Sequence, residues 1–319
     1  MNAATSPQSE KGGSLRVLIT GGSGLLALNW ACAIRDRHEV VLGIHRRKVA
    51  LRGTVCVALD LEDAGALAVN MQRLAPDVVV HTAGLTSVDD CERDPALAHH
   101  VNADLAAAVA HAAALSGARL VHISTDHLFA GTRSLYSEDA PPEPLNAYAR
   151  SKLHAESRVA AASPQALIVR TNFFGWGHRY RRSFSDWVYY ELHAGRTLTL
   201  FDDVFVTPIL ADALALTCHR LLEDGATGIY NVTGDERISK YDFGDALADV
   251  FGFPKALLRR GKIAASQLSA LRPPDMSLDN ARTRARLGTS LGNLADHLRT
   301  LRQQDSDGRR AELLAAITE

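Results

Sequence analysis

A glycine-rich turn near the amino terminus constrains the fold of this chain more than any other segment. The run Thr20-Gly21-Gly22-Ser23-Gly24-Leu25-Leu26-Ala27 follows an apolar stretch at 15–20 and opens a helical pattern over 25–36. Gly21 permits a tight turn, Gly24 lets the backbone approach a pyrophosphate, and the small Ala27 lets helix and strand pack closely. A phosphate would then sit at the positive helix end. The context predicts a dinucleotide site with contacts from Gly21, Ser23, Gly24, Leu25 and Leu26; the alternative is a simple turn.

Short apolar runs alternate with longer helical patterns along most of the chain. This alternation is typical of βαβ units built around a parallel sheet. The sequence predicts an α/β fold, a Rossmann-type doubly wound parallel sheet with a smaller, mainly C-terminal α/β substrate lobe. Strands are expected at 15–20, 40–44, 55–59, 78–82, 120–124 and 166–170, and an alanine-rich helix at 95–116.

The pattern loosens after Asn172 into an aromatic and arginine-rich stretch, where we expect the second lobe to begin. Short apolar runs at 197–201 and 228–232 follow, and the second of these looks like a return to the sheet. The predicted cofactor-binding domain covers 14–172 with return segments near 204–233. The predicted substrate lobe covers 173–203 and 234–305. We expect a C-terminal helix or tail at 306–319 and a disordered tail at 1–13.

Composition excludes several classes of protein. The chain has 319 residues, 46% of them hydrophobic and 22% charged, with a net charge of −1. It lacks the basic surplus expected of a nucleic-acid binder. No window approaches ~18 uninterrupted apolar residues, so no membrane span is expected, and residues 1–13 resemble no signal peptide. The cysteines lack metal-ligand spacing, so we expect buried thiols, no metal and a cytoplasmic protein; they are Cys32, Cys56, Cys91 and Cys218.

Basic residues follow the second predicted strand, where an acidic residue would bind the adenosine ribose of NAD. The chain reads His45-Arg46-Arg47 there, and the two arginines could bind a 2′-phosphate with charge-assisted hydrogen bonds. The sequence therefore favours NADP(H), with NAD(H) possible; the alternative is a solvated basic turn. Further cofactor contacts are predicted after the third and fourth strands, at Asp60, Leu61, Thr82, Ala83 and Gly84.

The stretch Tyr148-Ala-Arg-Ser-Lys152 lies about 125 residues downstream of the glycine turn. Residues four apart on a helix share one face, so we expect the Lys152 ammonium to lie beside the Tyr148 phenol and favour its ionised form. A tyrosine tuned in this way can give a proton to a carbonyl oxygen. Together with the glycine turn, the pair indicates a reductase.

These motifs together resemble the extended short-chain dehydrogenase/reductases, and within them the dTDP-4-dehydrorhamnose reductase family. The similarity spans about residues 15 to 300. It is carried by Thr20 to Ala27, His81 to Gly84, Val88 to Glu92, Val101-Asn102, Ser124-Thr125-Asp126, Pro144 to Tyr148, Lys152, Arg170-Thr171, Thr207-Pro208, Gly228 to Val232 and Arg272-Pro273.

The resemblance implies roles for individual residues. Thr125 would hydrogen-bond the substrate carbonyl, Tyr148 would donate the proton, and Lys152 would bind the nicotinamide ribose. Asn102 would support a proton relay. Ser124 is the rival hydroxyl for the role of Thr125. The implied cofactor contacts also include Thr86, Ser124, Tyr148, Lys152 and Thr171, and the implied substrate contacts are Thr86, Val88, Asp126, His127, Asn172, Phe173, Trp176, Arg179 and Thr207.

Some positions differ from the family pattern. His127 stands where tyrosine is usual, so it could contact the sugar or serve in packing. Arg179, Arg181 and Arg182 are placed to meet a substrate diphosphate, or they form a solvated basic face. Trp187, like Trp176, fits the core of the lobe better than a base-stacking platform.

Three functions remain open from the sequence. The first is NADPH-dependent reduction of the 4-keto group of a nucleotide-linked 4-keto-6-deoxysugar in deoxysugar or polysaccharide biosynthesis. The second is epimerisation or dehydration of a nucleotide sugar on the same scaffold. The third is a non-catalytic NADP-binding subunit, because the family resembles the β subunit of methionine adenosyltransferase. The resemblance suggests a monomer or homodimer.

Overall fold

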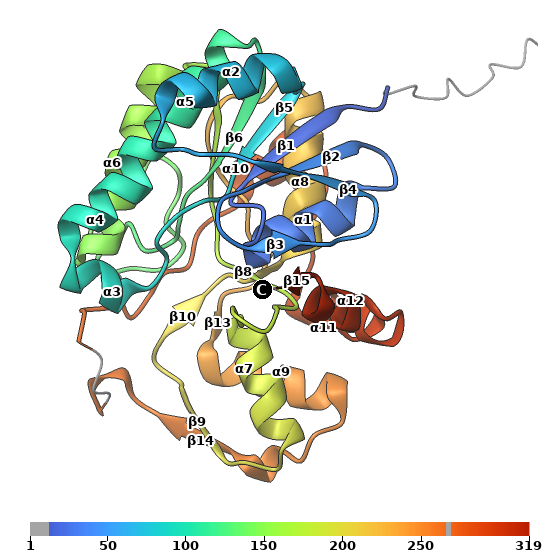
Figure 1. Cartoon of the computed structure of the whole chain (residues 1–319). Coiled ribbons are helices and arrows are strands. Elements are labelled where there is room, and N and C mark those ends of the chain that lie inside the picture. Colours follow the sequence, from blue (N-terminus) through green and yellow to red (C-terminus); the bar gives the residue numbers. More distant parts are fainter. Residues whose placement is uncertain (1–12, 266–268, 319) are drawn as a thin grey trace, which may run out of the picture.

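A seven-stranded parallel sheet forms the centre of the computed structural model, which describes residues 13–265 and 269–318 (Figure 1). The strand order is β12-β7-β6-β5-β1-β2-β4. The chain runs outward from β1 in one direction and then returns to add β5 on its other side. The strands are β1 (Arg16–Thr20), β2 (Glu39–Ile44), β4 (Thr54–Ala58), β5 (Val78–His81), β6 (Arg119–Ile123), β7 (Leu167–Arg170) and β12 (Gly228–Asn231).

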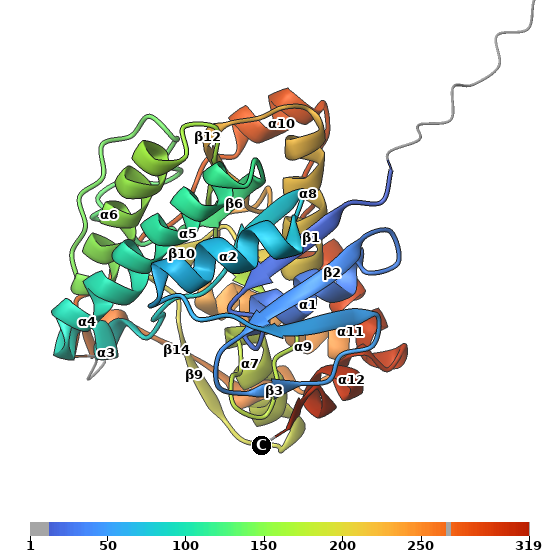
Figure 2. The ribbon, with the colours of Figure 1, turned by 45° about the horizontal axis from the view of Figure 1, so that its top comes forward.

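Helices cover both faces of this sheet, as Figures 1 and 2 show. Side chains alternate along a strand, so Val17 and Ile19 pack into one apolar cluster and Leu18 packs into the other. On the Val17 face lie α1 (Leu25–Ile34) and α8 (Ala211–Glu223); on the Leu18 face lie α2 (Ala64–Leu74), α5 (Leu105–Leu115) and α6 (Ala147–Ala162). The predicted α/β doubly wound sheet is confirmed, and each predicted sheet strand lies within one residue of its observed bounds.

The predicted helix over 95–116 is divided in the structure. After the short α3 (Val88–Arg93), the chain forms α4 (Pro95–His99), a π-helical turn at His100–Asp104, and then α5. Wide turns of this kind often occur at functional positions. Here the turn carries Asn102 inward, where it is 1% exposed.

The second lobe lies beyond the carboxyl edge of the sheet, in the lower half of Figure 1. Its helices are α7 (Phe184–His193) and α9 (Lys240–Phe251), with 3-10 turns at Lys255–Leu257 and Ile263–Ala265. Paired short strands connect it: β9 (Leu198–Phe201) with β14 (Leu258–Gly261), β10 (Phe205–Val206) with β13 (Ile238–Ser239), and β8 (Phe173–Phe174) with β11 (Ile209–Leu210).

The C-terminal segments return to the sheet domain. Helix α10 (Ala281–Leu287) contacts α8 and β12, although the sequence places this range in the substrate lobe. Helices α11 (Leu294–Ser306) and α12 (Arg309–Ala315) precede β15 (Ile317–Thr318), which pairs with β3 (Lys48–Val49). Ile317 is fully buried, and Arg35 bonds Glu312 at 2.6 Å. Residues 309–318 therefore pack against the sheet domain. The predicted tail at 1–13 lies, except for Gly13, outside the described residues.

Candidate functional site

The glycine turn forms a cradle at the carboxyl end of β1. Gly21 has a φ of +68°, and a Cβ there would lie 2.8 Å from the Ala83 backbone. A Cβ on Gly22 would lie 2.8 Å from the Leu42 side chain, a constraint that the sequence did not reveal. Gly24 precedes α1 and provides no side-chain cap, so the first N–H groups of the helix remain available. This geometry fits a pyrophosphate.

A groove of about 580 Å³ runs from this cradle along the carboxyl ends of β1 and β5. The strand order reverses at this point, which is where open parallel sheets bind their ligands. Many of the predicted cofactor residues line it: Gly21, Ser23, Gly24, Leu25, Leu26, Arg47, Thr82, Ala83, Gly84, Thr86 and Tyr148. A second set of lining residues was not among the predicted cofactor contacts. It includes His178, Tyr180 and Ser183, together with Arg181 and Arg182, which the sequence assigned to a substrate diphosphate or a solvated basic face.

Other predicted cofactor residues lie outside the groove lining. His45 and Arg46 are exposed beside it, whereas Arg47 lines it and lies 5.2 Å above the Tyr180 ring. The carboxylate of Asp60 accepts a hydrogen bond from the Glu62 N–H at 2.9 Å. Leu61 packs against the apolar cluster under α2, and the hydroxyl of Thr171 is buried. Arg47 thus brings a guanidinium group to this end of the groove.

Tyr148, Lys152 and Glu156 occupy one face of α6. Asn146 caps the helix by accepting a hydrogen bond from the Ala149 N–H at 2.8 Å. The Lys152 ammonium donates to the carbonyl of Ile123 at 2.7 Å. Burial lowers the pKa of Lys152 to about 8, and the nearby Glu156 carboxylate opposes that shift. The lysine is therefore held at the end of β6, below the groove.

The pKa of Tyr148 differs from the expectation. Burial raises it to about 12, and a hydrogen bond with Thr125 only partly offsets this effect. The expected lowering by Lys152 is wrong for this arrangement of side chains, because the cost of burying a phenolate exceeds the attraction of nearby cations. Tyr148 therefore keeps its proton at neutral pH, the form that a proton donor requires.

The two rival hydroxyls have different partners. The Ser124 hydroxyl donates to Glu156 at 2.5 Å, and Glu156 also forms a buried ion pair with Arg170 at 2.8 Å. The Thr125 hydroxyl instead donates to Asp126 at 3.2 Å and lies beside Tyr148. Thr125 is thus the hydroxyl that faces the proposed proton donor, while Ser124 belongs to a structural network.

Asn102 serves the loop that follows β5. Its carbonyl oxygen accepts from the Leu85 N–H at 2.7 Å, and its amide donates to the Leu85 carbonyl at 3.0 Å and to Ser151 at 2.9 Å. These contacts show that the Asn102 side chain holds the loop at 84–86. Its part in a proton relay stays a prediction.

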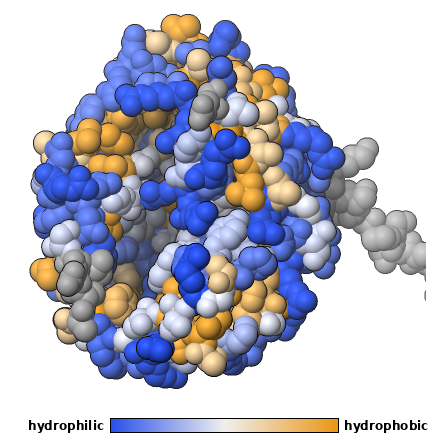
Figure 3. Space-filling view, turned by 60° about the horizontal axis from the view of Figure 1, so that its bottom comes forward, coloured by the Kyte–Doolittle hydropathy of each residue, from blue (hydrophilic) through white to orange (hydrophobic). Residues whose placement is uncertain are grey.

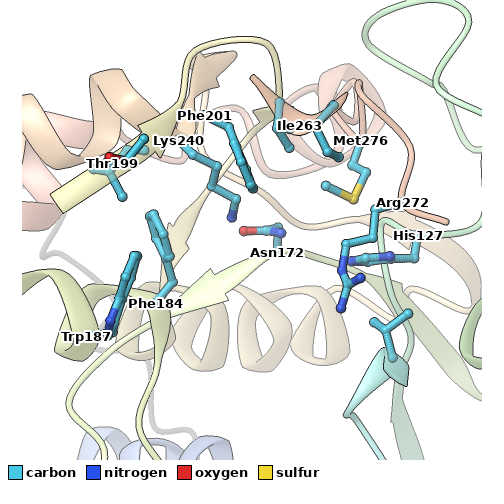
Figure 4. Close-up of a pocket in the computed structure, with 13 residues that line it drawn as sticks. His127, Asn172, Phe184, Trp187, Thr199, Phe201, Lys240, Ile263, Arg272 and Met276 are labelled. Carbon is cyan, nitrogen blue, oxygen red and sulfur yellow. The ribbon is translucent and has the colours of Figure 1, made fainter. Parts of the chain in front are cut away.

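A second cavity, of about 360 Å³, lies between the sheet edge and the second lobe (Figure 4). Its lining is mainly apolar and aromatic, with basic side chains among it. The Arg272 guanidinium bonds Asp89 at 2.7 Å, and Lys240 lies 4.5 Å from the Phe184 ring centre. The lining residues are Val88, His127, Asn172, Phe184, Trp187, Thr199, Leu200, Phe201, Val204, Lys240, Ile263, Arg272 and Met276.

His127 and Asn172 connect this cavity to the residues around Tyr148. The His127 ring meets the Tyr148 ring edge-on, with centroids 5.5 Å apart. The Asn172 amide donates to Asp126 at 2.6 Å, and Asp126 in turn accepts from Thr125. Tyr148 lines the groove and packs against His127 of the cavity lining, so the two spaces adjoin at this residue.

Comparison with known proteins agrees with this architecture. Residues 15–306 match the family described as RmlD substrate binding domain. The chain belongs to that family. The prediction of an extended short-chain dehydrogenase/reductase, an NAD(P)-dependent oxidoreductase type, is therefore confirmed.

Individual members of the RmlD family differ in what they are named for. A Haloferax volcanii protein named "Probable low-salt glycan biosynthesis reductase Agl14" is 31% identical, with 91% of this chain and 98% of that protein covered. "Methionine adenosyltransferase 2 subunit beta" of Xenopus tropicalis is 30% identical, covering 76% and 74%. A structure of a hypothetical dTDP-4-dehydrorhamnose reductase from Sulfolobus tokodaii superposes with a TM-score of 0.76 at 33% identity, covering 88% and 97%.

Several residues predicted from the RmlD family pattern lie elsewhere. Trp176 is fully buried and donates to the Leu301 carbonyl at 2.9 Å, so its assignment as a substrate contact is wrong. Thr207 is 2% exposed, and its hydroxyl accepts from the Leu278 N–H at 3.1 Å. Phe173 and Thr86 line the groove and not the cavity, and Arg179 lines neither. Conversely, Trp187 lines the cavity and is 41% exposed, although the sequence favoured a core position.

The cavity residues that the sequence missed come from separate elements. Phe184 and Trp187 lie on α7, and Lys240 begins α9. The sequence near Lys240 offers one hint of its role: it is a charged residue directly after Ser239, which caps the helix.

Within residues 13–265 and 269–318, no cluster of three or more His, Cys, Asp or Glu side chains is suited to hold a metal ion. The helices of the same part are too short or too polar to cross a bilayer.

Proposed function

We propose that this RmlD family member reduces the 4-keto group of a nucleotide-linked 4-keto-6-deoxysugar with NADPH, as a step in deoxysugar or polysaccharide biosynthesis. One observation carries the proposal: the phenol of Tyr148 lies where the groove and the apolar cavity meet. A cofactor in the groove and a sugar in the cavity would both reach it. The substrate class is supported by the family relationship and by the carbonyl-binding hydroxyls.

Bound NADPH would supply a hydride to the keto carbon. Tyr148 then donates its proton to the carbonyl oxygen, and the Thr125 hydroxyl stabilises the negative charge that develops there. Asp126 orients Thr125, since it accepts that residue's hydrogen bond at 3.2 Å. The buried Lys152 ammonium would bind the cofactor ribose. Its pKa of about 8 lets it retain charge near neutral pH.

The preference for NADPH is supported by the end of β2. Arg47 lines the groove, Arg46 lies beside it, and neither forms an ion pair within the described residues. Guanidinium groups without carboxylate partners suit a phosphate. NADH would lack this contact and bind more weakly.

The direct test measures oxidation of NADPH, with NADH in parallel, by purified protein offered a panel of nucleotide-linked 4-keto-6-deoxysugars. Stoichiometric NADPH loss with one sugar, and formation of its 4-hydroxy product, would establish the activity. Product formation without net NADPH loss would instead indicate an epimerase or dehydratase, because those reactions regenerate the cofactor.

A second candidate follows from the methionine adenosyltransferase β subunits among the relatives. In that case the chain would bind NADPH and a catalytic partner without reducing a sugar. The reductase proposal would be replaced if the chain bound NADPH tightly, turned over no sugar in the panel and copurified with a methionine adenosyltransferase.

The proposed assembly is a monomer or homodimer in the cytoplasm. Sedimentation of the purified chain would distinguish the two states.

A further inference from the structure

A short loop of the second lobe lines one side of the cofactor groove. It comprises residues 177–183 and is here named the Arg181 loop. Asp186 ties its two ends together, because its carboxylate accepts from the N–H groups of Gly177 and Ser183, each at 2.8 Å. Within the loop, His178 and Arg181 exchange two backbone hydrogen bonds, at 2.9 and 3.0 Å. Gly177 has no room for a side chain, since a Cβ would collide with the Arg181 carbonyl. The loop is therefore a compact, preorganised unit.

This loop reaches the cofactor-binding segments of the sheet domain at several points. The His178 imidazole lies against the backbone of Ser23 in the glycine cradle. The Arg181 guanidinium donates to the Thr86 hydroxyl, and the Tyr180 ring lies under Arg47. Both Arg181 and Arg182 line the groove. The second lobe thus forms one wall of the groove.

The part of the groove lining near this loop carries more positive than negative charge. Arg47, Arg181 and Arg182 form no ion pair within the described residues. Asp90 is the acidic residue in the described groove lining, and it already pairs with Arg93. Unpaired guanidinium groups opposite a free helix terminus provide donors for an anion with several oxygens. A diphosphate has this chemistry.

We infer that Arg181 and Arg182 bind the diphosphate of the dinucleotide from the side opposite the glycine cradle. A diphosphate also occurs in the nucleotide sugar, so the same chemistry has two possible sources. The cofactor is favoured because both arginines line the groove and neither lines the apolar cavity. This inference rests on the proposed cofactor, and it extends the site to residues that the sequence assigned to a substrate diphosphate.

The loop also links the two binding spaces. Ser183 lines the groove and caps α7 by accepting from the Asp186 N–H at 3.0 Å. The next residue, Phe184, and Trp187 one turn later line the apolar cavity. Cofactor phosphates that hold the loop would therefore also hold the start of α7. The expected consequence is that bound NADP⁺ strengthens binding of the nucleotide portion of the substrate.

The test compares Arg181→Ala and Arg182→Ala with Arg179→Ala. Arg179 is a matched control because it is exposed on the same loop but lines neither space. Calorimetry would measure the Kd for NADP⁺, the Kd for dTDP, and the Kd for dTDP with NADP⁺ present. Arg181→Ala and Arg182→Ala should each weaken NADP⁺ about tenfold, as expected for loss of a charge-assisted hydrogen bond. Arg179→Ala should stay within about twofold of the unmutated chain.

The effect of bound NADP⁺ on the affinity for dTDP is the second measurement. NADP⁺ should tighten dTDP binding to the unmutated chain about fivefold or more, and Arg181→Ala should remove most of that gain. Arg181→Lys should restore part of the NADP⁺ affinity, because it keeps the charge but loses the forked geometry. All three arginines are exposed, so the variants should fold, and circular dichroism would check this.

Three results would overturn the inference. Weakened dTDP binding with unchanged NADP⁺ binding would assign the arginines to the substrate diphosphate. Equal NADP⁺ affinity in Arg181→Ala, Arg182→Ala and Arg179→Ala would show that the wall does not contact the cofactor. If the unmutated chain bound no NADP⁺, the proposed cofactor and the inference would both be wrong. If it bound NADP⁺ and only the arginine variants failed to differ, the inference alone would be wrong.

Discussion

The cofactor groove and the substrate cavity meet at Tyr148 but are built differently. The groove uses backbone groups, glycines and arginines, and many of its residues come from short contiguous motifs at strand ends. The cavity uses aromatic and aliphatic side chains from α7, α9 and the short strands of the second lobe. A diphosphate can be recognised by one turn of backbone, whereas the shape of a sugar has to be enclosed from several directions. The residues that determine the reaction type therefore lie in short local motifs. The residues that would select the substrate come from segments far apart in the sequence.

Tyr148, which lines the groove and packs against His127 of the cavity lining, should show the largest effect. Tyr148→Phe removes the proton but keeps the buried ring, so turnover should fall about a hundredfold to ten-thousandfold. The Kd for NADPH should change little. Steady-state kinetics and a binding titration check both statements. Unchanged turnover would exclude Tyr148 as the proton donor.

The next prediction concerns the groove alone. Arg47→Ala should weaken NADPH binding about tenfold or more through loss of a charge-assisted contact, with little change for NADH. Arg46→Ala is the matched control, because its exposed side chain lies beside the groove, and its effect should be smaller. The double variant should resemble Arg47→Ala. Equal losses for NADPH and NADH would contradict a 2′-phosphate site, and the two dissociation constants are the measurement.

The third prediction concerns the cavity alone. Lys240 lies near Asp126 and over the Phe184 ring, and it has no ion pair within the described residues. Lys240→Met should raise the KM for the sugar nucleotide several-fold, about the effect of one polar contact. The Kd for NADPH should stay constant. Lys255→Met, which alters an exposed ion-paired lysine on the surface, should change neither value. A loss of NADPH affinity in Lys240→Met would mean that Lys240 also affects the groove, which would contradict its assignment to the cavity alone.

The last prediction concerns stability and not binding or turnover: a pH dependence that comes from the buried Lys152. Its folded pKa is about 8, below the ordinary 10.5, so the unfolded chain binds the additional proton between these values. Stability relative to Lys152→Met should therefore rise as pH increases from about 8 to 10.5. Each unit of pKa difference corresponds to about 1.4 kcal/mol. Urea unfolding of both proteins across this range is the measurement, and a constant difference would contradict the buried, destabilised ammonium.

Two tryptophans show where prediction from sequence ends. Trp176 and Trp187 lie eleven residues apart in one aromatic stretch. The local pattern favoured the core for both, although the family resemblance placed Trp176 among the substrate contacts. Trp176 is fully buried, while Trp187 lines the cavity at 41% exposure. Nothing in the local pattern separates them, because α7 acquires its buried face from contacts with β9 and with α9, which lies far along the sequence. The same limit hid Lys240 and the position of Arg181 and Arg182 beside the groove.

The sequence by itself determined the parallel sheet, the glycine cradle and the Tyr148–Lys152 pair. Short continuous apolar runs and a strand–turn–helix junction are local properties, so their positions could be read to within a residue. The tertiary structure alone decided which hydroxyl faces Tyr148, that burial raises its pKa, and which arginines enter the groove. Those outcomes depend on groups tens to hundreds of residues apart, whose contacts and desolvation exist only after the chain has folded.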